Sequence, residues 1–335
     1  MAVGSISAGY DFTCALLTGG TVECWGANQY GQLGNGTTTG PDTCNAPDGC
    51  STTPVAVTGL SGVTAISAGY GSACALLMGG TVECWGDNDA GESGNGTPGS
   101  TTNSSTPVAV TGLSGVTAIS AGYVSACALL TGGTVECWGS NMFGVLGDGT
   151  TTGPDLCASE GCSPTPVAVT GLSGVTAISV SDYFACALLT GGTVECWGYN
   201  GYRQLGNGTA TDSTTPVAVT GLSGVTAISA GYDSTCALLT GGTVECWGDS
   251  GYGELGNGAT TGPDTCEDSV GCSITPVAVT GLSGVTAISA GFESACALLT
   301  GGTVECWGDN QYDALGNSTA DAQTSSSMPV AVTGF

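Results

Sequence analysis

The chain of 335 residues contains no histidine and no lysine, and Arg203 is its only basic side chain. Without histidine there is no Ser–His or Cys–His nucleophile, and without lysine no Schiff base can form. We therefore expect no enzymatic activity, and only the chemistry of paired carboxylates, as in glycosidases, stays formally open.

The scarcity of cations also restricts the partners. The 27 Asp and Glu residues give a net charge of −26. Binding to nucleic acid depends on Lys and Arg displacing counterions from phosphates, so DNA, RNA and anionic lipid are excluded. An acidic surface favours solubility, cations or basic partners.

Long hydrophobic runs are missing as well. No apolar stretch approaches the roughly 20 residues that cross a bilayer, so we expect no membrane insertion. The sequence begins at Met1 without a charged segment and an apolar segment behind it. We expect that any export signal is absent from this numbering or has been removed.

One phrase, C-A-L-L-[TM]-G-G-T-V-E-C-W-G, occurs six times. A period of 50 to 60 residues is too long for a two-helix repeat and suits one small sheet per repeat. The sequence therefore predicts an all-β, six-bladed β-propeller in a single domain, 1–335. The phrase occupies Cys14–Gly26, Cys74–Gly86, Cys127–Gly139, Cys186–Gly198, Cys236–Gly248 and Cys296–Gly308, and the repeats span approximately 1–60, 61–113, 114–172, 173–222, 223–282 and 283–335.

The second repeat shows the expected strands. Ser61–Tyr70, Ser72–Leu77, Thr81–Trp85 and Thr106–Leu113 are short runs separated by glycine turns or polar loops. Glycines supply the positive φ of tight hairpins, and an opening proline costs little at the start of an outer strand. Four short antiparallel strands per repeat are the content of a propeller blade.

Eighteen cysteines form a regular pattern that predicts nine disulfides. In a hairpin around Thr18-Gly19-Gly20, Cys14 lies opposite Cys24, and a non-hydrogen-bonded pair brings the Cα atoms to about 4.5 Å. Each such bridge stabilises by about 2–3 kcal/mol. Zinc thiolates are the weaker alternative, because the usual C-x2-C spacing and histidine partners are missing. The predicted pairs are Cys14–Cys24, Cys74–Cys84, Cys127–Cys137, Cys186–Cys196, Cys236–Cys246, Cys296–Cys306, Cys44–Cys50, Cys157–Cys162 and Cys266–Cys272.

The residues around W-G carry a resemblance to a known family. W-G-A-N-Q-Y-G-Q-L-G-N-G-T (Trp25–Thr37) resembles the W-G-x-N-x-x-G-Q-L-G-x-G signature of the regulator of chromosome condensation repeats. The resemblance implies a β-propeller, usually of seven blades, and six copies here give six. The family's histidine and a basic, chromatin-binding surface are absent, so only the fold is carried over. The chain is most similar to the cysteine-rich, secreted bacterial branch, in which one member type inhibits β-lactamase purely by binding.

The ends and the insertions suggest higher-order patterns. The start, Val3–Tyr10, and the end, Pro329–Phe335, are complementary parts of one repeat. The last strand is therefore expected to complete the sheet of the first, within one chain or between chains in a filament. Insertions clasped by cysteines occur only in alternate repeats, Gly40–Cys50, Gly153–Cys162 and Gly262–Cys272, which indicates duplicated blade pairs and approximate three-fold symmetry. Variable loops on one face of a rigid scaffold are where a partner is expected.

Several residue sets have both a functional and a structural interpretation. Carboxylates of the clasped loops could bind calcium weakly, but solvated acidic loops are the simpler interpretation. One glutamate per repeat is interpreted as an outer-strand charge that blocks edge-to-edge aggregation. One tryptophan per repeat is interpreted as packing between blades rather than as a sugar-stacking surface. The calcium candidates are Asp42, Asp48, Asp155, Glu160, Asp264, Glu267 and Asp268, the glutamates are Glu23, Glu83, Glu136, Glu195, Glu245 and Glu305, and the tryptophans are Trp25, Trp85, Trp138, Trp197, Trp247 and Trp307.

Asn-X-Ser/Thr sequences are open to two interpretations, N-glycosylation or turn chemistry. They lie at Asn35, Asn95, Asn103, Asn207 and Asn317.

The sequence thus predicts a non-enzymatic protein of the extracellular space or cell surface, since nine disulfides need an oxidising compartment. The first hypothesis is a structural building block of a surface assembly or filament, which self-associates. The alternative is a secreted module that captures a protein or glycan through its loop face. No cofactor is expected other than calcium.

Overall fold

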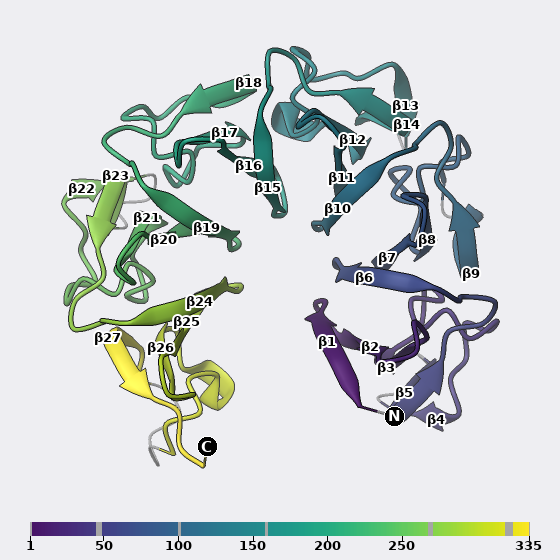
Figure 1. The fold of residues 1–335 in the computed structure, drawn as a ribbon, viewed down its shortest axis with the longest axis horizontal. Coiled ribbons are helices and arrows are strands. Elements are labelled where there is room, and N and C mark those ends of the chain that lie inside the picture. The colour runs from purple at the N-terminus through teal and green to yellow at the C-terminus, as the bar shows by residue number, and fades with distance from the viewer. Residues whose placement is uncertain are drawn as a thin grey trace. The chain divides into compact units, whose positions relative to one another are not determined.

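The computed structural model describes residues 2–44, 49–99, 102–157, 160–266, 271–318 and 324–334. It confirms a six-bladed β-propeller with four antiparallel strands in the repeated unit (Figure 1). The chain consists of two compact units of three sheets each, Met1–Gly174 and Val175–Phe335. No helix among the described residues has the length and apolar character that crossing a membrane requires.

The first unit contains three sheets whose strands follow one another in chain order, apart from the short strands β4 and β13. Blade 1 contains β1 (Val3–Ala8), β2 (Phe12–Leu17), β3 (Val22–Ala27), β5 (Gly49–Ala56) and β4 (Asp42–Thr43). Blade 2 contains β6 (Val63–Ala68), β7 (Ser72–Leu77), β8 (Val82–Gly86) and β9 (Ser104–Ala109). Blade 3 contains β10 (Val116–Ala121), β11 (Ser125–Leu130), β12 (Val135–Ser140), β14 (Glu160–Ala168) and β13 (Asp155–Cys157), with the 3-10 helix η2 (Met142–Gly144) in its loop.

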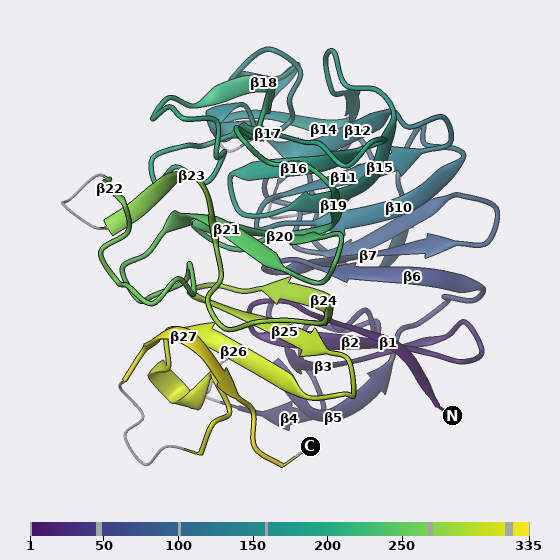
Figure 2. The same ribbon diagram turned by 60° about the vertical axis from the view of Figure 1, so that its left-hand side comes forward.

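The second unit repeats the same plan (Figure 2). Blade 4 contains β15 (Val175–Val180), β16 (Phe184–Leu189), β17 (Val194–Gly198) and β18 (Ser213–Ala218). Blade 5 contains β19 (Val225–Ala230), β20 (Ser234–Leu239), β21 (Val244–Asp249), β23 (Gly271–Ala278) and β22 (Asp264–Thr265). Blade 6 contains β24 (Val285–Ala290), β25 (Ser294–Leu299), β26 (Val304–Gly308) and β27 (Ser326–Ala331), with the 3-10 helix η4 (Gln311–Asp313).

The hairpin between the second and third strands has the predicted register. In blade 1, Cys14 pairs with Cys24 and Ala15 pairs with Glu23. The six bridges of this type have Cα separations of 4.0 to 4.1 Å, as expected for directly opposed residues on neighbouring strands. The three close pairs are also bridged, and no described cysteine is free. All nine predicted disulfides are therefore present.

The clasped insertions are short hairpins rather than open loops. β4, β13 and β22 pair with the beginning of β5, β14 and β23 and add a fifth strand to blades 1, 3 and 5. Blades 2, 4 and 6 have four strands. The alternation agrees with the predicted duplication of blade pairs.

The prediction that the last strand completes the first sheet is wrong. β27 pairs with β26 in the sheet of blade 6, and β1 pairs with β2 in the sheet of blade 1. The chain boundaries fall between blades, so each sheet is built from one continuous stretch of sequence. The physical reason is that four consecutive strands already satisfy their ladder hydrogen bonds locally.

Neighbouring blades meet through a junction that recurs within the units. The tryptophan of one blade donates its indole N–H to a backbone carbonyl in the preceding blade, as Trp85 does to Gln32 at 2.9 Å. Trp138, Trp247 and Trp307 donate to Glu92, Gln204 and Glu254 in the same way. Both blades of a junction contribute to one apolar cluster, and Trp85 shares its cluster with Cys14 and Leu16 of blade 1. Tryptophan therefore packs between blades, as predicted.

Two further backbone hydrogen bonds recur at the same four junctions. Ala68 N–H donates to the Ser7 hydroxyl, and Val63 N–H donates to the Gly20 carbonyl. The alanine equivalents are Ala121, Ala230 and Ala290, and the valine equivalents are Val116, Val225 and Val285. We call the surface of a blade that contacts the preceding blade its leading face, and the surface that contacts the following blade its trailing face. The leading face supplies the donors, and the trailing face supplies the acceptors.

Candidate functional site

The loop after the third strand is held by one buried asparagine. Asn28 accepts a hydrogen bond from Leu33 N–H at 3.0 Å and donates to the Thr37 carbonyl at 2.9 Å. Asn88, Asn141, Asn200 and Asn310 accept the equivalent backbone bond in other blades. Because the asparagine satisfies the loop backbone from inside, the residues around it can vary without loss of the loop.

The Asn-Gly-Thr sequences in these loops form turns. The Asn35 side-chain oxygen accepts hydrogen bonds from Thr37 N–H at 3.2 Å and Thr37 Oγ1 at 3.1 Å. Asn95 and Asn207 do the same. In blade 3, Asp148 takes the place of this asparagine and accepts the same hydrogen bonds from Thr150. An oxygen acceptor is thus the structural requirement here, which supports the turn interpretation.

N-glycosylation remains a prediction at all five asparagines. Asn103 lies outside these turns and accepts a hydrogen bond from Asn88 N–H at 2.9 Å. Asn317 is described, but Thr319, the third residue of its sequence, lies outside the described residues.

Within the first unit, tyrosines and carboxylates surround a cavity of about 280 Å³. Tyr30 comes from the loop of blade 1, and Tyr70 and Tyr123 come from the turns after the first strands of blades 2 and 3. The loop of blade 2 contributes most of the carboxylates, and the clasped hairpin of blade 3 forms another wall. We call this cavity the acid–tyrosine pocket; its carboxylates are Asp87, Asp89, Glu92 and Glu160.

Two tyrosines of the pocket, Tyr70 and Tyr123, form part of a short aromatic stack. The ring centroids of Tyr10 and Tyr70 are 4.9 Å apart, and those of Tyr70 and Tyr123 are 4.1 Å apart. Each ring follows the Ala-Gly that ends a first strand, so one aromatic residue comes from each blade. Tyr70 and Tyr123 line the same cavity as the carboxylates, and aromatic rings beside carboxylates suit an organic cation.

Glu92 occupies a position at which glutamine serves equally well. Glu92 is 2% exposed and accepts a hydrogen bond from Ala90 N–H at 2.9 Å. Gln32 accepts the equivalent bond from Tyr30 N–H at 2.9 Å. The loop forms the same backbone hydrogen bond with either side chain at this position. The negative charge of Glu92 is therefore not needed for the geometry of the loop.

The pocket carboxylates lack a cation to offset them. Burial, and secondarily the charge of Asp87, raises the pKa of Glu92 to about 8. Burial, and then Asp89, raises the pKa of Asp87. Asp89 Oδ1 is buried and has no hydrogen-bond partner among the described residues. Since Arg203 lies in the second unit, no basic side chain of the first unit can neutralise these groups.

The second unit carries a related cluster, in which Asp249 and Glu254 occupy the repeat positions of Asp87 and Glu92. Burial, and then Asp249, raises the pKa of Asp233 to about 8, and burial raises the pKa of Asp182 to about 7. Burial also raises the pKa of Glu254 to about 8. Tyr232 stacks on Phe292 with ring centroids 4.4 Å apart. Buried acids beside aromatic rings therefore occur in both units.

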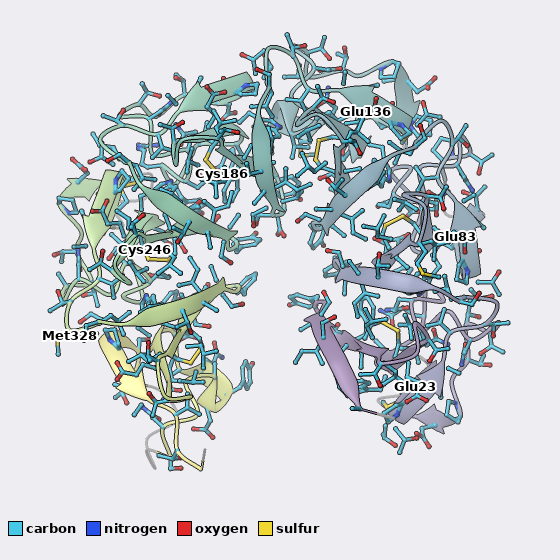
Figure 3. All side chains as sticks on the ribbon, viewed as in Figure 1. Glu23, Glu83, Glu136, Cys186, Cys246 and Met328 are labelled. Carbon is cyan, nitrogen blue, oxygen red and sulfur yellow. A yellow bond between two sulfur atoms is a disulfide. The ribbon has the colours of Figure 1, made fainter. Side chains whose placement is uncertain are left out.

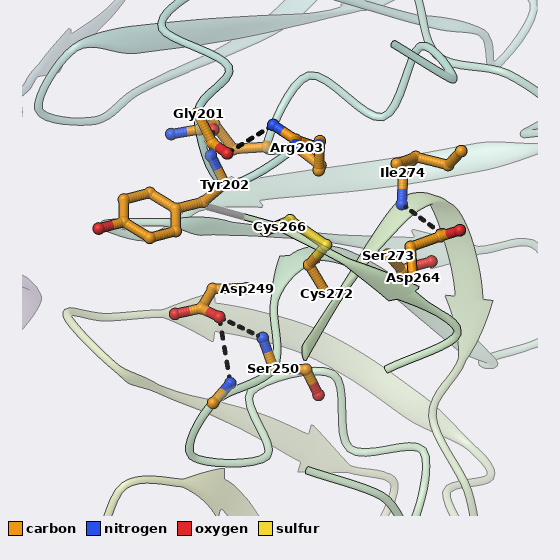
Figure 4. Close-up of a disulfide and its surroundings, with 12 residues drawn as sticks. Gly201, Tyr202, Arg203, Asp249, Ser250, Asp264, Cys266, Cys272, Ser273 and Ile274 are labelled. Carbon is orange, nitrogen blue, oxygen red and sulfur yellow. Dashed lines mark hydrogen bonds between the residues drawn. A yellow bond between two sulfur atoms is a disulfide. The ribbon is translucent and has the colours of Figure 1, made fainter. Parts of the chain in front are cut away.

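Figure 4 shows how part of this cluster is held. Asp249 accepts hydrogen bonds from the N–H groups of Ser250 and Gly251 at 2.7 and 3.1 Å. Arg203 donates to the carbonyls of Gly201 and Asn200, at 2.6 and 3.2 Å, and makes no ion pair among the described residues. The only basic side chain is thus used by its own loop.

The structure gives no support to calcium binding in the clasped hairpins. Asp42 accepts hydrogen bonds from Thr52 N–H and Oγ1 at 2.8 and 2.7 Å, and these bonds lower its pKa. Asp264 accepts one from Ile274 N–H at 3.1 Å. Across the described part of the chain, no three His, Cys, Asp or Glu side chains are grouped to hold a metal ion. Asp155 and Glu160 belong to that part, whereas Asp48, Glu267 and Asp268 lie outside it.

The repeated glutamates do not lie on outer strands, so that interpretation is wrong. Glu23 lies on β3, which pairs with β2 on one side and β5 on the other. Figure 3 shows Glu23, Glu83 and Glu136, each on the third strand of its own blade. Their side chains are half-buried between neighbouring strands. Glu195, Glu245 and Glu305 have the same place in the second unit.

The repeat, the strand order and the loop chemistry agree with one family. The model of the RCC1-like domain matches residues 1–334. The chain belongs to the RCC1-like domain family.

This RCC1-like chain matches parts of longer relatives. It is 30% identical over 217 residues to human E3 ubiquitin-protein ligase HERC2, covering 62% of this chain and 4% of that protein. It is 29% identical over 215 residues to the ultraviolet-B receptor UVR8 of Arabidopsis thaliana, covering 62% of this chain and 44% of that protein. The chain thus spans less than half the length of these curated relatives.

Solved structures show the same fold. Yeast RCC1 (Prp20), crystallised with Kap60, has a TM-score of 0.83 at 21% identity, covering 99% of this chain and 75% of that chain. Human WBSCR16 has a TM-score of 0.79 at 21% identity, covering 99% of this chain and 83% of that chain.

The acid–tyrosine pocket was not predicted from the sequence. However, two positions of the loop after the third strand vary between repeats and indicate the pocket. The residue after Trp-Gly is Asp in blades 2, 5 and 6, and Glu replaces Gln in blades 2 and 5. Comparison of repeats finds these positions, but the partners Tyr30 and Tyr123 come from other blades and need the fold.

Proposed function

We propose that this RCC1-like chain is a non-enzymatic binding module that holds a basic protein segment. A lysine or arginine side chain of the partner enters the acid–tyrosine pocket, where its charge meets Asp87 and Asp89 and its stem lies against Tyr30 and Tyr70. The observation that carries the proposal is a cavity lined by the buried Glu92, the partly buried Asp87 and Asp89, and aromatic rings, in a unit with no basic side chain.

Physical complementarity supports a cationic partner over a neutral glycan. A buried carboxylate without a counter-charge is costly, and a bound cation relieves this cost. Cation–π contacts with tyrosine add about 0.5–2 kcal/mol, depending on desolvation. The net charge of −26 attracts a basic partner over long range and accelerates its association.

Protein partners also agree with what is described for structures of the same fold. Yeast RCC1 was crystallised with Kap60, and the structure of Prp20p is described with its binding to Gsp1p and histones. By analogy with these cases, we propose that the partner of this chain is a protein. The acidic charge of the pocket is the reason for proposing that its bound segment is basic.

An extracellular or cell-surface location is part of the proposal. Nine disulfides and no free cysteine among the described residues are characteristic of an oxidising compartment. The hypothesis of a structural building block needs a surface for self-association. The acid–tyrosine pocket cannot supply it, because two copies of an acidic surface repel each other.

Calorimetric titration with a lysine-rich peptide tests the proposal. Asp87→Asn combined with Asp89→Asn should weaken binding at least about tenfold at physiological salt, because both pocket charges are lost. The same peptide with acetylated lysines should not bind.

The matched control is Asp148→Asn, which removes a carboxylate from a turn in which other blades already have asparagine. It should change the affinity by less than about twofold. Asp148→Asn removes one charge and the pocket variant removes two. If Asp148→Asn weakens binding by half as much, in free energy, as the pocket variant does, the attraction is unspecific and the pocket is not the site.

A further inference from the structure

Blade 2 has a small residue where the other repeats have an aromatic ring. Ala90 lines the acid–tyrosine pocket together with the carboxylates of the same loop. The equivalent residues of the other five repeats are Tyr30, Phe143, Tyr202, Tyr252 and Tyr312. Because a methyl group is much smaller than an aromatic ring, alanine leaves space in this wall of the cavity. The volume of about 280 Å³ is below the roughly 300–1,000 Å³ of pockets for drug-sized ligands, and it suits a single side chain.

The residue before Ala90 is also peculiar to blade 2. Asp89 lines the cavity, and the other repeats have an uncharged residue at its position. Asp89 Oδ1 is buried and has no hydrogen-bond partner among the described residues. Blade 2 therefore combines added space with an acceptor that the surrounding protein leaves unsatisfied. The uncharged equivalents are Gln29, Met142, Gly201, Gly251 and Gln311.

The neighbouring carboxyl groups already accept hydrogen bonds from the loop backbone. Asp87 Oδ1 accepts from the N–H groups of Asn88 and Asp89 at 2.8 and 3.3 Å. Glu92 accepts from Ala90 N–H at 2.9 Å. A buried acceptor without a partner is costly, and a ligand that brings an N–H donor to Asp89 Oδ1 removes that cost. The free acceptor thus favours a ligand with hydrogen-bond donors.

Organic cations differ in how well they meet this requirement. A quaternary ammonium group has no donor. The ammonium group of lysine is a compact, strongly hydrated charge with three donors. The guanidinium group of arginine is planar and less strongly hydrated, carries five donors in a fixed fork, and stacks on aromatic rings. Since Tyr30, Tyr70 and Tyr123 line the same cavity as Asp87 and Asp89, guanidinium suits both parts of its lining.

We propose that the acid–tyrosine pocket selects arginine over lysine and that Asp89 determines this preference. The inference rests on the proposed function, because it specifies which basic side chain of the partner is bound. The guanidinium group occupies the space beside Ala90, donates to Asp89 Oδ1, and packs its plane against the tyrosines of the pocket.

Calorimetric titration with matched peptides tests the proposal. An arginine-rich peptide has the same length and spacing of charges as the lysine-rich peptide, so unspecific attraction to the acidic surface is equal for both. The parent chain should bind the arginine-rich peptide at least about tenfold more tightly, which is the effect of one further charge-assisted hydrogen bond. Asymmetric dimethylation of the arginines keeps the charge and removes donors, so it should abolish this preference.

Two variants assign the preference to the pocket. Asp89→Ala removes the free acceptor, and the ratio of the two affinities should fall below about twofold. Ala90→Tyr retains every carboxylate and restores the aromatic residue of the other repeats. It should weaken binding of the arginine-rich peptide at least about tenfold, because the ring fills the space that the ligand needs. Asp148→Asn, which removes a charge of the same unit outside the pocket, is the control and should retain the preference.

The outcomes separate this proposal from the proposed function. Unfolding temperatures equal to that of the parent show that each variant is folded. If the parent binds both peptides equally and the Asp87→Asn, Asp89→Asn variant binds both more weakly, the selectivity is wrong and the basic partner stands. A preference for arginine that persists in Asp89→Ala, or unchanged binding by Ala90→Tyr, also overturns the selectivity proposed here. If neither peptide binds the parent chain, both proposals fail.

Discussion

Ser93 is a buried polar residue at a position where other blades have leucine. Ser93 is 1% exposed, and its hydroxyl has no hydrogen-bond partner among the described residues. The equivalent leucines are completely buried: Leu33, Leu146, Leu205, Leu255 and Leu315. A buried unpaired hydroxyl costs about 1–3 kcal/mol, so this residue weakens blade 2.

Replacing Ser93 by the repeat's own leucine should stabilise the protein. Ser93→Leu should raise the free energy of unfolding by about 2 kcal/mol, because it removes the unpaired hydroxyl and buries an apolar side chain. Chemical denaturation measures this change.

Ser93→Ala is the matched control, since it removes the hydroxyl without adding volume. It should stabilise by less than Ser93→Leu. If Ser93→Leu destabilises while Ser93→Ala does not, the surrounding side chains have closed over the smaller residue and no leucine-sized space exists.

At the scale of single residues, the sequence identified the cysteine pairs but not the acidic pocket. The pairing of Cys14 with Cys24 follows from hairpin geometry, which depends only on neighbours in the chain. The pocket that Glu92 lines also includes residues distant in the chain, such as Tyr123 and Glu160. Rules that use only neighbours in the chain therefore predict the cysteine pairs and do not predict the acidic pocket.

The disulfides between the second and third strands of a blade and those of the clasped hairpins have different surroundings. Cys74 and Cys84 are 2% and 0% exposed and belong to the cluster of the junction between blades 2 and 3. Cys44 is exposed, at the edge of a two-residue strand. Loop-closure entropy is similar for separations of 10 and 6 residues, so any difference in stability comes from location.

Removal of one bridge of each kind should reveal this difference. Cys74→Ala with Cys84→Ala should lower the free energy of unfolding by about 3–5 kcal/mol, because a core bridge and buried sulfur are both lost. Cys44→Ala with Cys50→Ala should cost only about 1–2 kcal/mol.

Thermal unfolding of the two double variants side by side measures both effects. Equal losses would show that the clasps contribute to the blade core, contrary to the exposure of Cys44.

At the scale of elements, the four strands per blade were predictable because glycine turns and alternating runs are local signals. The fifth strands β4, β13 and β22 were not predicted. Each has two or three residues and pairs only because its disulfide returns the chain to the following strand. The place of Glu23 was also misjudged, since β3 lies inside its sheet and not at an edge.

For the whole molecule, the buried acids should make stability fall as pH rises. The pKa of Glu92 and that of Glu254 are about 8 in the folded chain, above the ordinary 4.5. Between these values the unfolded chain releases the proton and the folded chain keeps it, so rising pH favours unfolding. The stability is fully present below about pH 4.5 and is lost progressively up to about pH 8.

Substitution with glutamine should remove this dependence. Glu92→Gln or Glu254→Gln should raise the free energy of unfolding by about 2 kcal/mol at pH 8 and have little effect at pH 4.5. Glutamine fits, because Gln32 and Gln204 make the same backbone hydrogen bond.

The reverse change, Gln32→Glu, should introduce a new loss of stability at high pH. Denaturation curves collected across this pH range measure both effects. A Gln32→Glu variant with the pH profile of the parent would contradict the role assigned to burial.

The sequence by itself determined the repeat, the four strands common to all blades, the hairpin register and all nine disulfides, because each depends on residues close together in the chain. Only the tertiary structure decided which carboxylates line one pocket and which strands lie inside a sheet. These properties arise where neighbouring blades meet, and residues from different repeats contribute to them. The nearly identical repeats therefore predict the structure of each blade well. The effect of the residues that differ between repeats can be seen only when neighbouring blades are placed together.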